Sequence, residues 1–391
     1  MNRVAISGVA MTRFGKYPDA TIRSMAEQAV AETLDDAGAK PEDVECVFFA
    51  NAIAGLITGQ EMIRGQVALR NTGLLGTPLI NVENACASGS SAFHLAWLSV
   101  ASGLYNVAMA VGSEKMSHED KSRSFGAIGT AMDLEKRNDS GGSDKRSPFM
   151  DLYAERAAAY MERSGASPGT FAEVAVKNHE NGALNPLAQY QVRVSKEDVL
   201  ASREIVPPLT LLMCSPIGDG AAAAIVCSPD AVARLGVTNP VWVEASVVVS
   251  GRDRSPSEDS ALQRASSQAY EKAGLGPSDL DVVEVHDAAA PAELIAYEEL
   301  NLCPPGEGPA LLDSGATRLG GRMPVNPSGG LLSKGHPIGA TGIGQIAELV
   351  WHLRDQAGPR QVEGARVALS QNGGGHLGAD PAAMAVHILR T

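Results

Sequence analysis

Cys86 and His336 are the residues whose types and surroundings first suggest chemistry. Cys86 lies in the run NVENACASGSSAFH, residues 81–94, where small residues lead into an expected helix. His336 lies in the run GLLSKGHPIGATG, residues 330–342, which also leads into an expected helix. A helix N-terminus and a neighbouring imidazole both lower the pKa of a thiol. If the fold brings the two together, Cys86 is expected to be a nucleophile; otherwise it is a buried structural thiol.

An internal repeat relates the two residues. Residues 23–51 and 261–287 each read as an amphipathic helix, an Ala-Gly pair, a Pro-x-Asp turn and an apolar strand. Apolar residues at i,i+4 spacing indicate the helix. Gly38 and Gly274 are the expected C-cap glycines, because a proline follows shortly after each.

A second pair of matching segments extends this repeat. Residues 79–103 and 324–353 each read as a strand end with an asparagine, a Gly/Ser-rich loop and a helix. Aligning Gly89 with Gly339 places the cysteine opposite the histidine. Two such copies predict two α/β halves related by a pseudo-twofold axis, across which the two side chains would face one another.

The repeat divides the chain into an N-terminal half, residues 1–235, and a C-terminal half, residues 236–391. The first half contains an insertion over about 115–215 that is polar and rich in Gly and Ser. Long insertions in compact domains usually have a function, so we expect this one to cover a site. Three basic runs in it could hold an anionic ligand or form a solvated loop: KSR at 121–123, EKR at 135–137 and DKR at 144–146.

The composition is ordinary for a soluble globular protein. The 391 residues carry a formal net charge of −13, which argues against nucleic acid as a partner. The five cysteines are scattered without CxxC spacing, which argues against disulfides and zinc and for a reducing compartment. The first residues lack the apolar core of a signal peptide, and no run is long enough for a membrane span. We therefore expect a cytoplasmic protein with no membrane partner.

Several motifs together resemble the thiolase superfamily over essentially the whole chain. They are NVENACASGSSA at the cysteine, GSEKMS at 112–117, NPSGGLLSKGHPIGATG at 326–342 and NGGGHLG at 372–378. Within the superfamily, EVHDAAAPAELIAYEEL at 284–300 is similar to the branch of sterol-carrier-protein-type thiolases and archaeal acetoacetyl-CoA thiolases. The resemblance implies duplicated α/β halves layered αβαβα, with an inserted loop domain.

The resemblance also implies a mechanism. Cys86 would take an acyl group from coenzyme A, and His336 would activate it and help to build an oxyanion hole. A second oxyanion hole would use backbone near the nucleophile and a glycine close to Gly374. His286 would orient a water or bind the thioester oxygen. The substrate would be a CoA thioester, with no tightly bound cofactor and no metal.

Three further residues are expected at the substrate or oxyanion site: Asn326, Gln371 and His376. For His376, which lies outside the family pattern, a structural role and a substrate-pocket role are equally open. A buried core histidine is the alternative reading of His286.

The usual acid/base cysteine of thiolases is missing. One branch of the family places it where this chain has Gln371, and the sterol-carrier-type branch places it at Ala288. Neither side chain can shuttle a proton as a thiol does. Cys214 and Cys303 are expected to be structural. The predicted function is acyl transfer through acyl-Cys86, and the alternative enzyme is a decarboxylating ketosynthase-like or hydrolytic variant.

Two kinds of protein partner are expected. A homodimer would form through the apolar strand at 106–112, NVAMAVG, as the family implies. Some relatives in this branch also work beside a small OB-fold protein with a zinc ribbon. A chain that only serves as a partner subunit, with little thiolase activity, is the remaining alternative.

Overall fold

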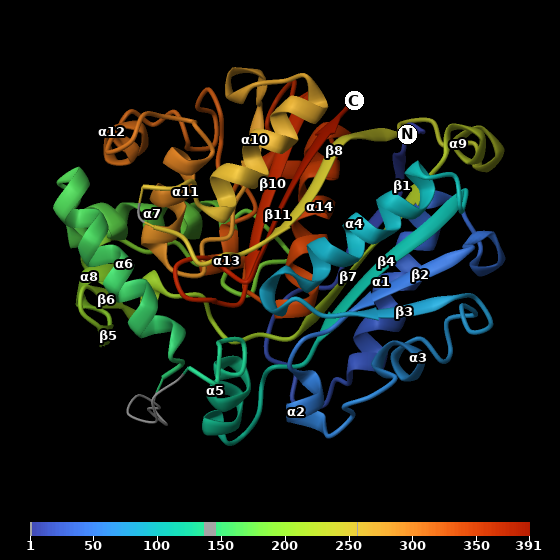
Figure 1. The fold of residues 1–391 in the computed structure, drawn as a ribbon, viewed down its shortest axis with the longest axis horizontal. Helices are drawn as coiled ribbons and strands as arrows, with labels where there is room; N and C mark the ends of the chain where they lie inside the picture. The colour runs from blue at the N-terminus through green and yellow to red at the C-terminus, as the bar shows by residue number, and fades with distance from the viewer. Residues whose placement is uncertain (1, 137–145, 256) are drawn as a thin grey trace.

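The computed structural model describes residues 2–136, 146–255 and 257–391, and a nine-stranded mixed sheet runs through its centre. The strand order is β3-β2-β4-β7-β1-β8-β11-β10-β9 (Figure 1). Five strands come from the first half: β1 (Ala5–Met11), β2 (Cys46–Ala50), β3 (Leu79–Val82), β4 (Val107–Glu114) and β7 (Gly220–Cys227). Four come from the second half: β8 (Val241–Ser250), β9 (Val282–Glu284), β10 (Val367–Gly374) and β11 (Ala383–Arg390).

The strand order confirms the duplication. In the first half the strands lie in the order β3-β2-β4-β7-β1, which is the third, second, fourth, fifth and first strand of that half along the chain. The second half, β8-β11-β10-β9, repeats this order in reverse, from its first strand to its second. In the second half the third strand is reduced to a single bridge between Val325 and Val283. The halves join where β1 meets β8, through the pairs Ala5–Trp242 and Ile6–Val241.

Helices lie on both faces of each half, as the αβαβα layering predicts. Helix α1 (Ile22–Ala37) packs on the outer face of the first half, and α10 (Ala261–Ala273) packs on the outer face of the second. Helices α4 (Ser88–Ala101) and α14 (Ile338–Leu353) share one apolar core with strands of both halves. Figure 1 shows these two helices between the blue-to-teal strands and the yellow-to-red strands.

The two outer helices begin and end as their sequences predict. Thr21 and Ser260 each cap the first turn with a capping box, so the free N–H groups there are satisfied. Gly38 and Gly274 end the helices with φ of 61° and 63°, in the left-handed region that favours glycine. Both C-cap predictions are therefore confirmed.

The central helices touch where the repeat aligns their glycines. A Cβ atom at Gly89 would lie 2.9 Å from the carbonyl oxygen of Gly339 and 3.2 Å from the nitrogen of Gly342. Real Cβ atoms essentially never pack that closely against backbone, so glycine is required at this crossing. This close approach brings the N-terminal ends of α4 and α14 together.

The described part of the insertion, without residues 137–145, contains four α-helices and a small hairpin. They are α5 (Lys121–Gly129), α6 (Phe149–Ser164), α7 (Pro168–Gly182), α8 (Lys196–Ala201), β5 (Glu204–Val206) and β6 (Leu209–Thr210). The remaining helices are α2 (Ala54–Thr58), α3 (Arg64–Ala68), α9 (Pro229–Leu235), α11 (Ala290–Glu299), α12 (Gly308–Asp313) and α13 (Gly330–Lys334). Of the three basic runs predicted in the insertion, Arg137, Asp144 and Lys145 lie outside the described residues.

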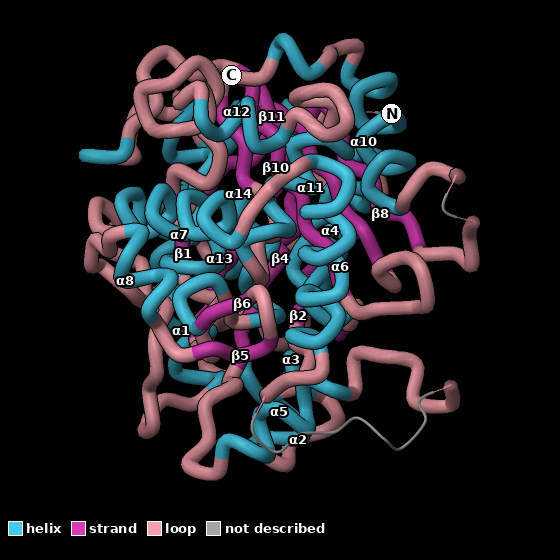
Figure 2. The backbone as a smooth tube through the Cα atoms, turned by 90° about the vertical axis from the view of Figure 1, so that its left-hand side faces the viewer, coloured by secondary structure: helices cyan, strands magenta, loops and turns pink. Residues whose placement is uncertain are grey.

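The insertion belongs to the first half in sequence, but its helices α6 and α7 pack on the second half, whereas α5 packs beside α2 of the first half. Helices α6 and α7 share an apolar core with α11 and with strands β8, β10 and β11. A buried ion pair of 2.9 Å between Lys177 and Glu293 joins α7 to α11. Figure 2 shows α6, α7, α8 and α11 on the same side of the molecule. The insertion therefore closes over the region where the two halves meet.

One prediction about the sheet is wrong. The strand expected to form the dimer, β4, is fully buried and hydrogen-bonded to β2 on one side and β7 on the other. The edge of the first half is β3, where Ile80 is 42% exposed.

No helix in the described ranges has the length and apolarity needed to cross a membrane. The division at 235/236 falls between α9 and β8 and stays a prediction.

Candidate active site

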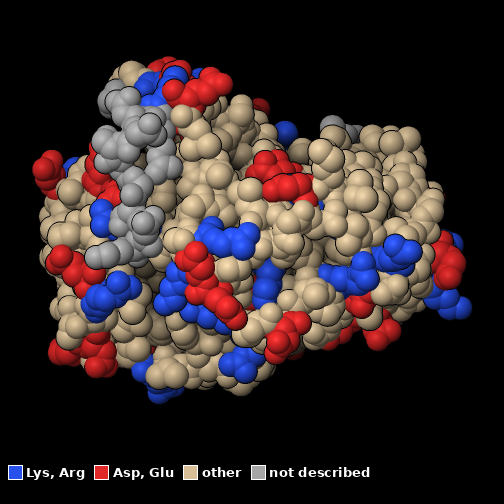
Figure 3. Space-filling model, turned by 90° about the horizontal axis from the view of Figure 1, so that it is seen from below, with Lys and Arg blue, Asp and Glu red and all other residues tan. Residues whose placement is uncertain are grey.

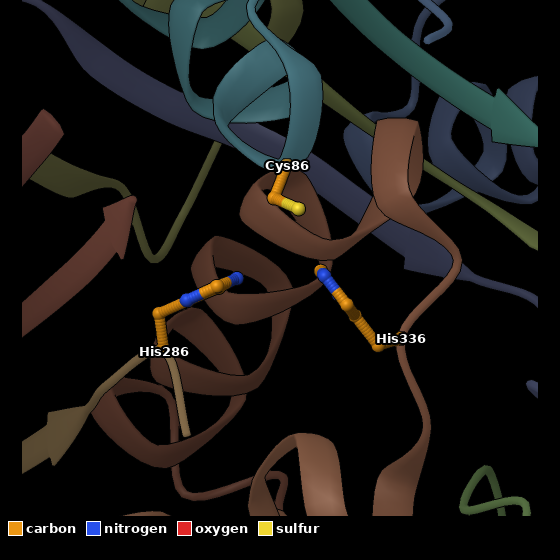
Figure 4. A group of neighbouring side chains, drawn as sticks. All are labelled: Cys86, His286 and His336. Atoms are coloured by element: carbon orange, nitrogen blue, oxygen red, sulfur yellow. The ribbon is translucent and has the colours of Figure 1, made fainter. Parts of the chain in front are cut away.

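Cys86 lies in a tight turn between β3 and α4. A short 3-10 turn spans Ala85–Ala87, and Ala85 has a φ of 48°, which is unusual for a residue with a Cβ atom. This strained turn directs the thiol into the centre of the molecule. In Figure 4 the sulfur points to the space between His286 and His336, and the three donor atoms lie within 4.8 Å of one another. The structure therefore brings together the three predicted catalytic residues.

The glycines of the last motif lie against this turn. A Cβ atom at Gly374 would clash with the carbonyl oxygen of Asn84, so the strand can approach only without a side chain. The next residue, Gly375, donates its backbone N–H to the sulfur of Cys86. The oxyanion glycine is expected close to Gly374, and the structure offers the N–H of Gly375 for this role, while Gly374 itself allows close packing.

His336 is held in one orientation by Thr341. The Nδ1 atom of His336 lies 2.8 Å from Oγ1 of Thr341, whose own hydroxyl donates to the carbonyl oxygen of Pro337 at 2.9 Å. Because that hydroxyl has a single proton, it accepts from His336, and Nδ1 carries the hydrogen. The Nε2 atom is buried, has no partner among the described residues, and presents a lone pair to the site.

His286 lies across the sulfur from His336. Their rings are nearly perpendicular, at 76°, with centroids 5.0 Å apart. The backbone N–H of His286 donates to Oε1 of Gln371 at 2.8 Å, and the Nε2 of Gln371 lies 3.1 Å from the sulfur of Met384. Gln371 therefore lines the site as expected, where it fixes the main chain of His286.

The thiol and both imidazoles are neutral at rest. Burial and, to a smaller extent, the charge of Glu114 raise the pKa of Cys86 to about 12, although the hydrogen bond from the Gly375 N–H opposes this rise. Burial lowers the pKa of His286 to about 4. Burial, followed by the charge of His286, holds the pKa of His336 well below its usual range. The lowered thiol pKa expected from the helix N-terminus and the imidazole is thus not found, because desolvation outweighs both effects.

Asn326 is buried and does not line the cavity, so it cannot make the predicted contact with substrate. Its Oδ1 accepts from the N–H of Val285 at 2.8 Å, and its Nδ2 donates to Oε2 of Glu293 at 2.8 Å. Both ends of the amide are therefore occupied. Asn326 instead anchors the segment that leads into His286.

A cavity of about 500 Å³ opens above the sulfur. It is lined by Cys86, His286, Ala288, His336, Gln371, Gly373, Gly375 and His376. His376 donates its backbone N–H to the carbonyl oxygen of Ala131 at 2.9 Å and lines the cavity, which favours the substrate-pocket alternative. Seven cationic side chains also line it: Lys16, Lys121, Arg146, Arg156, Arg163, Arg203 and Arg254. Figure 3 shows Lys and Arg side chains across the middle of the face seen from below, with Asp and Glu side chains between them.

The positions of the missing acid/base cysteine both face this cavity. Ala288 and Gln371 line it, but neither has a titratable group. Cys214 also lines the cavity, and its backbone forms an isolated β-bridge with Ala289. Its thiol donates to the carbonyl oxygen of Thr210 at 3.4 Å. Among the described thiols, Cys86 alone meets the two histidines. The same Cys-His-His donors are of types that bind zinc, and the expectation of a metal-free site stays a prediction.

Four residues of this site were not predicted from the sequence. Thr341 lies in the GATG run, five positions after His336, and Gly375 lies one position after the expected glycine. Tyr153 and Arg156, which line the cavity from α6, come from the insertion. Their spacing of three residues on an amphipathic helix indicates that they share one face of that helix. Only the packing of α6 shows that this face lines the cavity.

The fold and site define a class of duplicated α/β proteins in which a cysteine and two histidines meet at the N-terminal ends of two central helices. Family models agree with this class. Residues 4–230 match the family described as thiolase, N-terminal domain, and residues 247–390 match the thiolase C-terminal domain-like family. The chain belongs to the thiolase family.

Several known proteins are similar over nearly the whole chain. An acetyl-CoA acetyltransferase of Methanothermobacter thermautotrophicus is 41% identical over 99% of both chains. The benzoylsuccinyl-CoA thiolase subunit BbsB of Thauera aromatica is 39% identical over 95% of both. Rat sterol carrier protein 2 is 38% identical over 95% of this chain and 69% of its own length. These names match the predicted branch.

Solved structures share the fold. A chain of the Ltp2-ChsH2(DUF35) aldolase superposes with a TM-score of 0.80 and 26% identity, over 100% of this chain and 98% of that one. Human mitochondrial 3-ketoacyl-CoA thiolase in complex with CoA superposes with a TM-score of 0.73 over 100% and 98%, at 20% identity. The second likeness concerns the fold alone.

Proposed function

We propose that the protein is an acyl-CoA acyltransferase that carries the acyl group on Cys86. The observation that supports this most strongly is the meeting of its sulfur with the buried Nε2 atoms of His286 and His336 at the floor of a cavity. Relatives named as an acetyl-CoA acetyltransferase and a benzoylsuccinyl-CoA thiolase support the same activity. The CoA thioester is the substrate, and no tightly bound cofactor is required.

The neutral resting site suggests how acylation begins. As the sulfur of Cys86 attacks the thioester carbonyl, Nε2 of His336 takes the thiol proton, so a free thiolate is never needed. The Nε2 of His286, on the other side, donates to the carbonyl oxygen as negative charge develops there. The proton then passes from His336 to the departing CoA sulfur, which leaves acyl-Cys86 and free CoA.

The second half-reaction depends on a proton shuttle that the usual cysteine does not supply here. A decarboxylating variant needs no base at the attacking carbon, because loss of CO₂ creates the carbanion. The specific observation in its favour is that Ala288 and Gln371 face the cavity where thiols stand in other branches. General acid–base assistance contributes roughly 10²–10⁴-fold, so condensation and thiolysis of simple acyl-CoA are expected to be slow by that order.

Intact-mass measurement tests the proposal. Incubation with acetyl-CoA is expected to add one acetyl group to the wild-type protein and none to Cys86→Ala. Ala288→Cys restores a thiol at the cavity wall, and thiolysis of acetoacetyl-CoA is expected to rise in this variant. An adduct on another cysteine, or none with any acyl-CoA of a chain-length series, would overturn the proposal.

Two assemblies accompany this function. The exposed edge of β3 is suited to pair with the same strand of a second copy, which would give a homodimer. A small partner subunit, expected to combine an OB-fold and a zinc ribbon, is supported by the relative whose name joins Ltp2 to ChsH2(DUF35). A cytoplasmic location accords with the scattered, reduced cysteines.

A further inference from the structure

One wall of the cavity carries a cation that the proposed acyl transfer does not use. Helix α6 presents Tyr153, Arg156 and Arg163 to the cavity. These positions are three and seven residues apart, so they lie along one face of the helix. Arg156 is half-buried in the middle of this face.

The other cations of the cavity are either paired or exposed. Three form ion pairs: Arg146 with Asp151 at 2.7 Å, Arg163 with Glu298 at 2.5 Å and Arg254 with Asp380 at 2.7 Å. Three without ion pairs in the described ranges are exposed to solvent: Lys16, Lys121 and Arg203. Arg156 alone combines partial burial with the lack of a carboxylate partner among the described residues.

A half-buried guanidinium that forms no ion pair is costly, because it gives up hydration without gaining a charge-assisted hydrogen bond to a carboxylate. Glu299, at the end of α11, also lines the cavity. Burial raises the pKa of its carboxyl, and the charge of Arg156 offsets only part of this rise, since the two side chains form no ion pair. An anionic group of a bound ligand would supply the missing partner. A carboxylate matches the planar fork of the guanidinium with two parallel hydrogen bonds.

The charge of Arg156 acts on a side chain next to the nucleophile loop. Burial, followed by the charge of Arg156, lowers the pKa of His376. His376 directly follows Gly375, whose N–H contacts the Cys86 sulfur. Tyr153, one turn before Arg156, has its pKa raised first by burial and next by the charge of Cys86. The guanidinium is thus within electrostatic range of side chains that border the nucleophile.

We propose that Arg156 binds a carboxylate at the far end of the acyl group, so that the preferred substrates are CoA monothioesters of dicarboxylic acids. This inference rests on acyl transfer to Cys86. The phosphates of CoA are the other anionic source, and the exposed Lys16 and Arg203 are better placed for them because phosphates stay hydrated at a cavity mouth.

The reaction itself is unchanged. The bond between the carbonyl carbon and the CoA sulfur breaks, the bond to the Cys86 sulfur forms, and the thiol proton goes to CoA. The distal carboxylate takes no part in bond making. It contributes binding and orientation through Arg156, and this favours the charged acyl group over a neutral one of equal length.

Matched thioesters test the proposal on the full-length protein. Succinyl-CoA is compared with butyryl-CoA, and glutaryl-CoA with valeryl-CoA, since each pair exchanges a carboxylate for a methyl group. The rate of Cys86 acylation is followed by intact mass, with spontaneous hydrolysis of each thioester measured separately. The wild-type protein is expected to favour the charged member of at least one pair roughly 10- to 100-fold.

Arg156→Gln is expected to abolish this preference while leaving the butyryl and valeryl rates within about threefold of wild type, because a neutral acyl group does not use the guanidinium. Arg156→Lys is expected to keep part of the preference. Arg163→Gln, on the same helix face but already paired, is the control and is expected to keep all of it. Binding of CoA alone, measured by calorimetry, is expected to be unchanged in Arg156→Gln.

Three results would overturn the proposal. One is equal acylation by both members of every pair in the wild-type protein. Another is a loss in Arg156→Gln that affects charged and neutral thioesters alike. The third is weaker binding of CoA alone in Arg156→Gln, which would assign the guanidinium to a phosphate. If no thioester acylates Cys86 at all, the proposed function fails as well, and the two failures are thereby distinguished.

Discussion

His336 donates its Nδ1 hydrogen to Thr341, and this bond decides which ring nitrogen faces Cys86. The two atoms are 2.8 Å apart, and the threonine hydroxyl is committed to the carbonyl oxygen of Pro337. With the hydrogen on Nδ1, the lone pair of Nε2 is directed at the thiol. Thr341 is thus a positioning residue that acts through the histidine.

Thr341→Val tests this relationship. The variant keeps the shape of the side chain but loses the acceptor, so the histidine is free to adopt the other tautomer or rotate. We expect the rate of Cys86 acylation to fall about 10- to 100-fold, with little change in CoA binding. Thr341→Ser keeps a hydroxyl and is expected to restore most of the rate. Equal losses in both variants would show that packing, and not the hydroxyl, matters.

The raised pKa of Cys86 predicts how its alkylation depends on pH. With a pKa of about 12, the thiol is protonated throughout the neutral range, and the thiolate fraction grows as the pH rises. The rate of reaction with iodoacetamide should therefore increase about tenfold per pH unit between roughly pH 6 and pH 9, without a plateau. Mass spectrometry of the modified peptide measures it, with Cys86→Ala as the blank. A plateau near pH 6 would instead indicate a resting thiolate–imidazolium pair.

Gly374 and Gly373 form a matched pair of substitutions. A Cβ atom at Gly374 would clash with the backbone of the nucleophile turn, which cannot move away. At Gly373 it would meet the flexible end of Met384 at 3.1 Å. We expect Gly374→Ala to cost about 1–3 kcal/mol of unfolding free energy and most of the acylation rate. Gly373→Ala is expected to unfold close to wild type in urea, and the prediction fails if both are equally destabilised.

Lys177 holds the insertion on the second half. Its side chain is 1% exposed, and its ammonium group pairs with Glu293 at 2.9 Å and donates to the carbonyl oxygen of Val325 at 2.6 Å. Lys177→Met leaves the glutamate buried without its cation, and we expect a loss of about 3–5 kcal/mol in unfolding free energy. Lys196→Met breaks an ion pair with Glu173 in which both side chains reach solvent, and should cost under about 1 kcal/mol. Urea unfolding of both variants provides the comparison, and similar losses would contradict the assignment.

We expect two copies of the chain to form a homodimer along the edge strand β3. We expect sedimentation of the wild-type protein to give a dimer, because an unpaired apolar edge is avoided in stable monomers. Ile80→Lys places a charge on that edge and should shift the equilibrium toward monomer. Val192→Lys, at a residue 65% exposed on the insertion, is the control and should leave the dimer intact. A wild-type monomer at micromolar concentration would refute the prediction.

Local patterns in the sequence determined much of the fold. The repeat, the helix ends at Gly38 and Gly274, and the pairing of the Cys86 and His336 loops all depend on short-range rules or on aligning one segment with another. Those rules hold because caps, turns and glycine crossings are set by a few neighbouring residues. The family motifs added the roles expected of the cysteine and the two histidines.

The tertiary structure decided what depends on distant neighbours. Burial in a cavity shared by both halves keeps the Cys86 thiol protonated, although its place before a helix suggested a thiolate. The side-chain amide of Asn326 forms hydrogen bonds with Val285 and Glu293, and β4 is paired with a strand on each side. The spacing of residues in the sequence does not reveal these contacts. Helix α6 brings Arg156 into the cavity because its apolar face finds its core on the second half. Desolvation and packing sum contributions from residues far apart in the chain, so only the folded arrangement sets their balance.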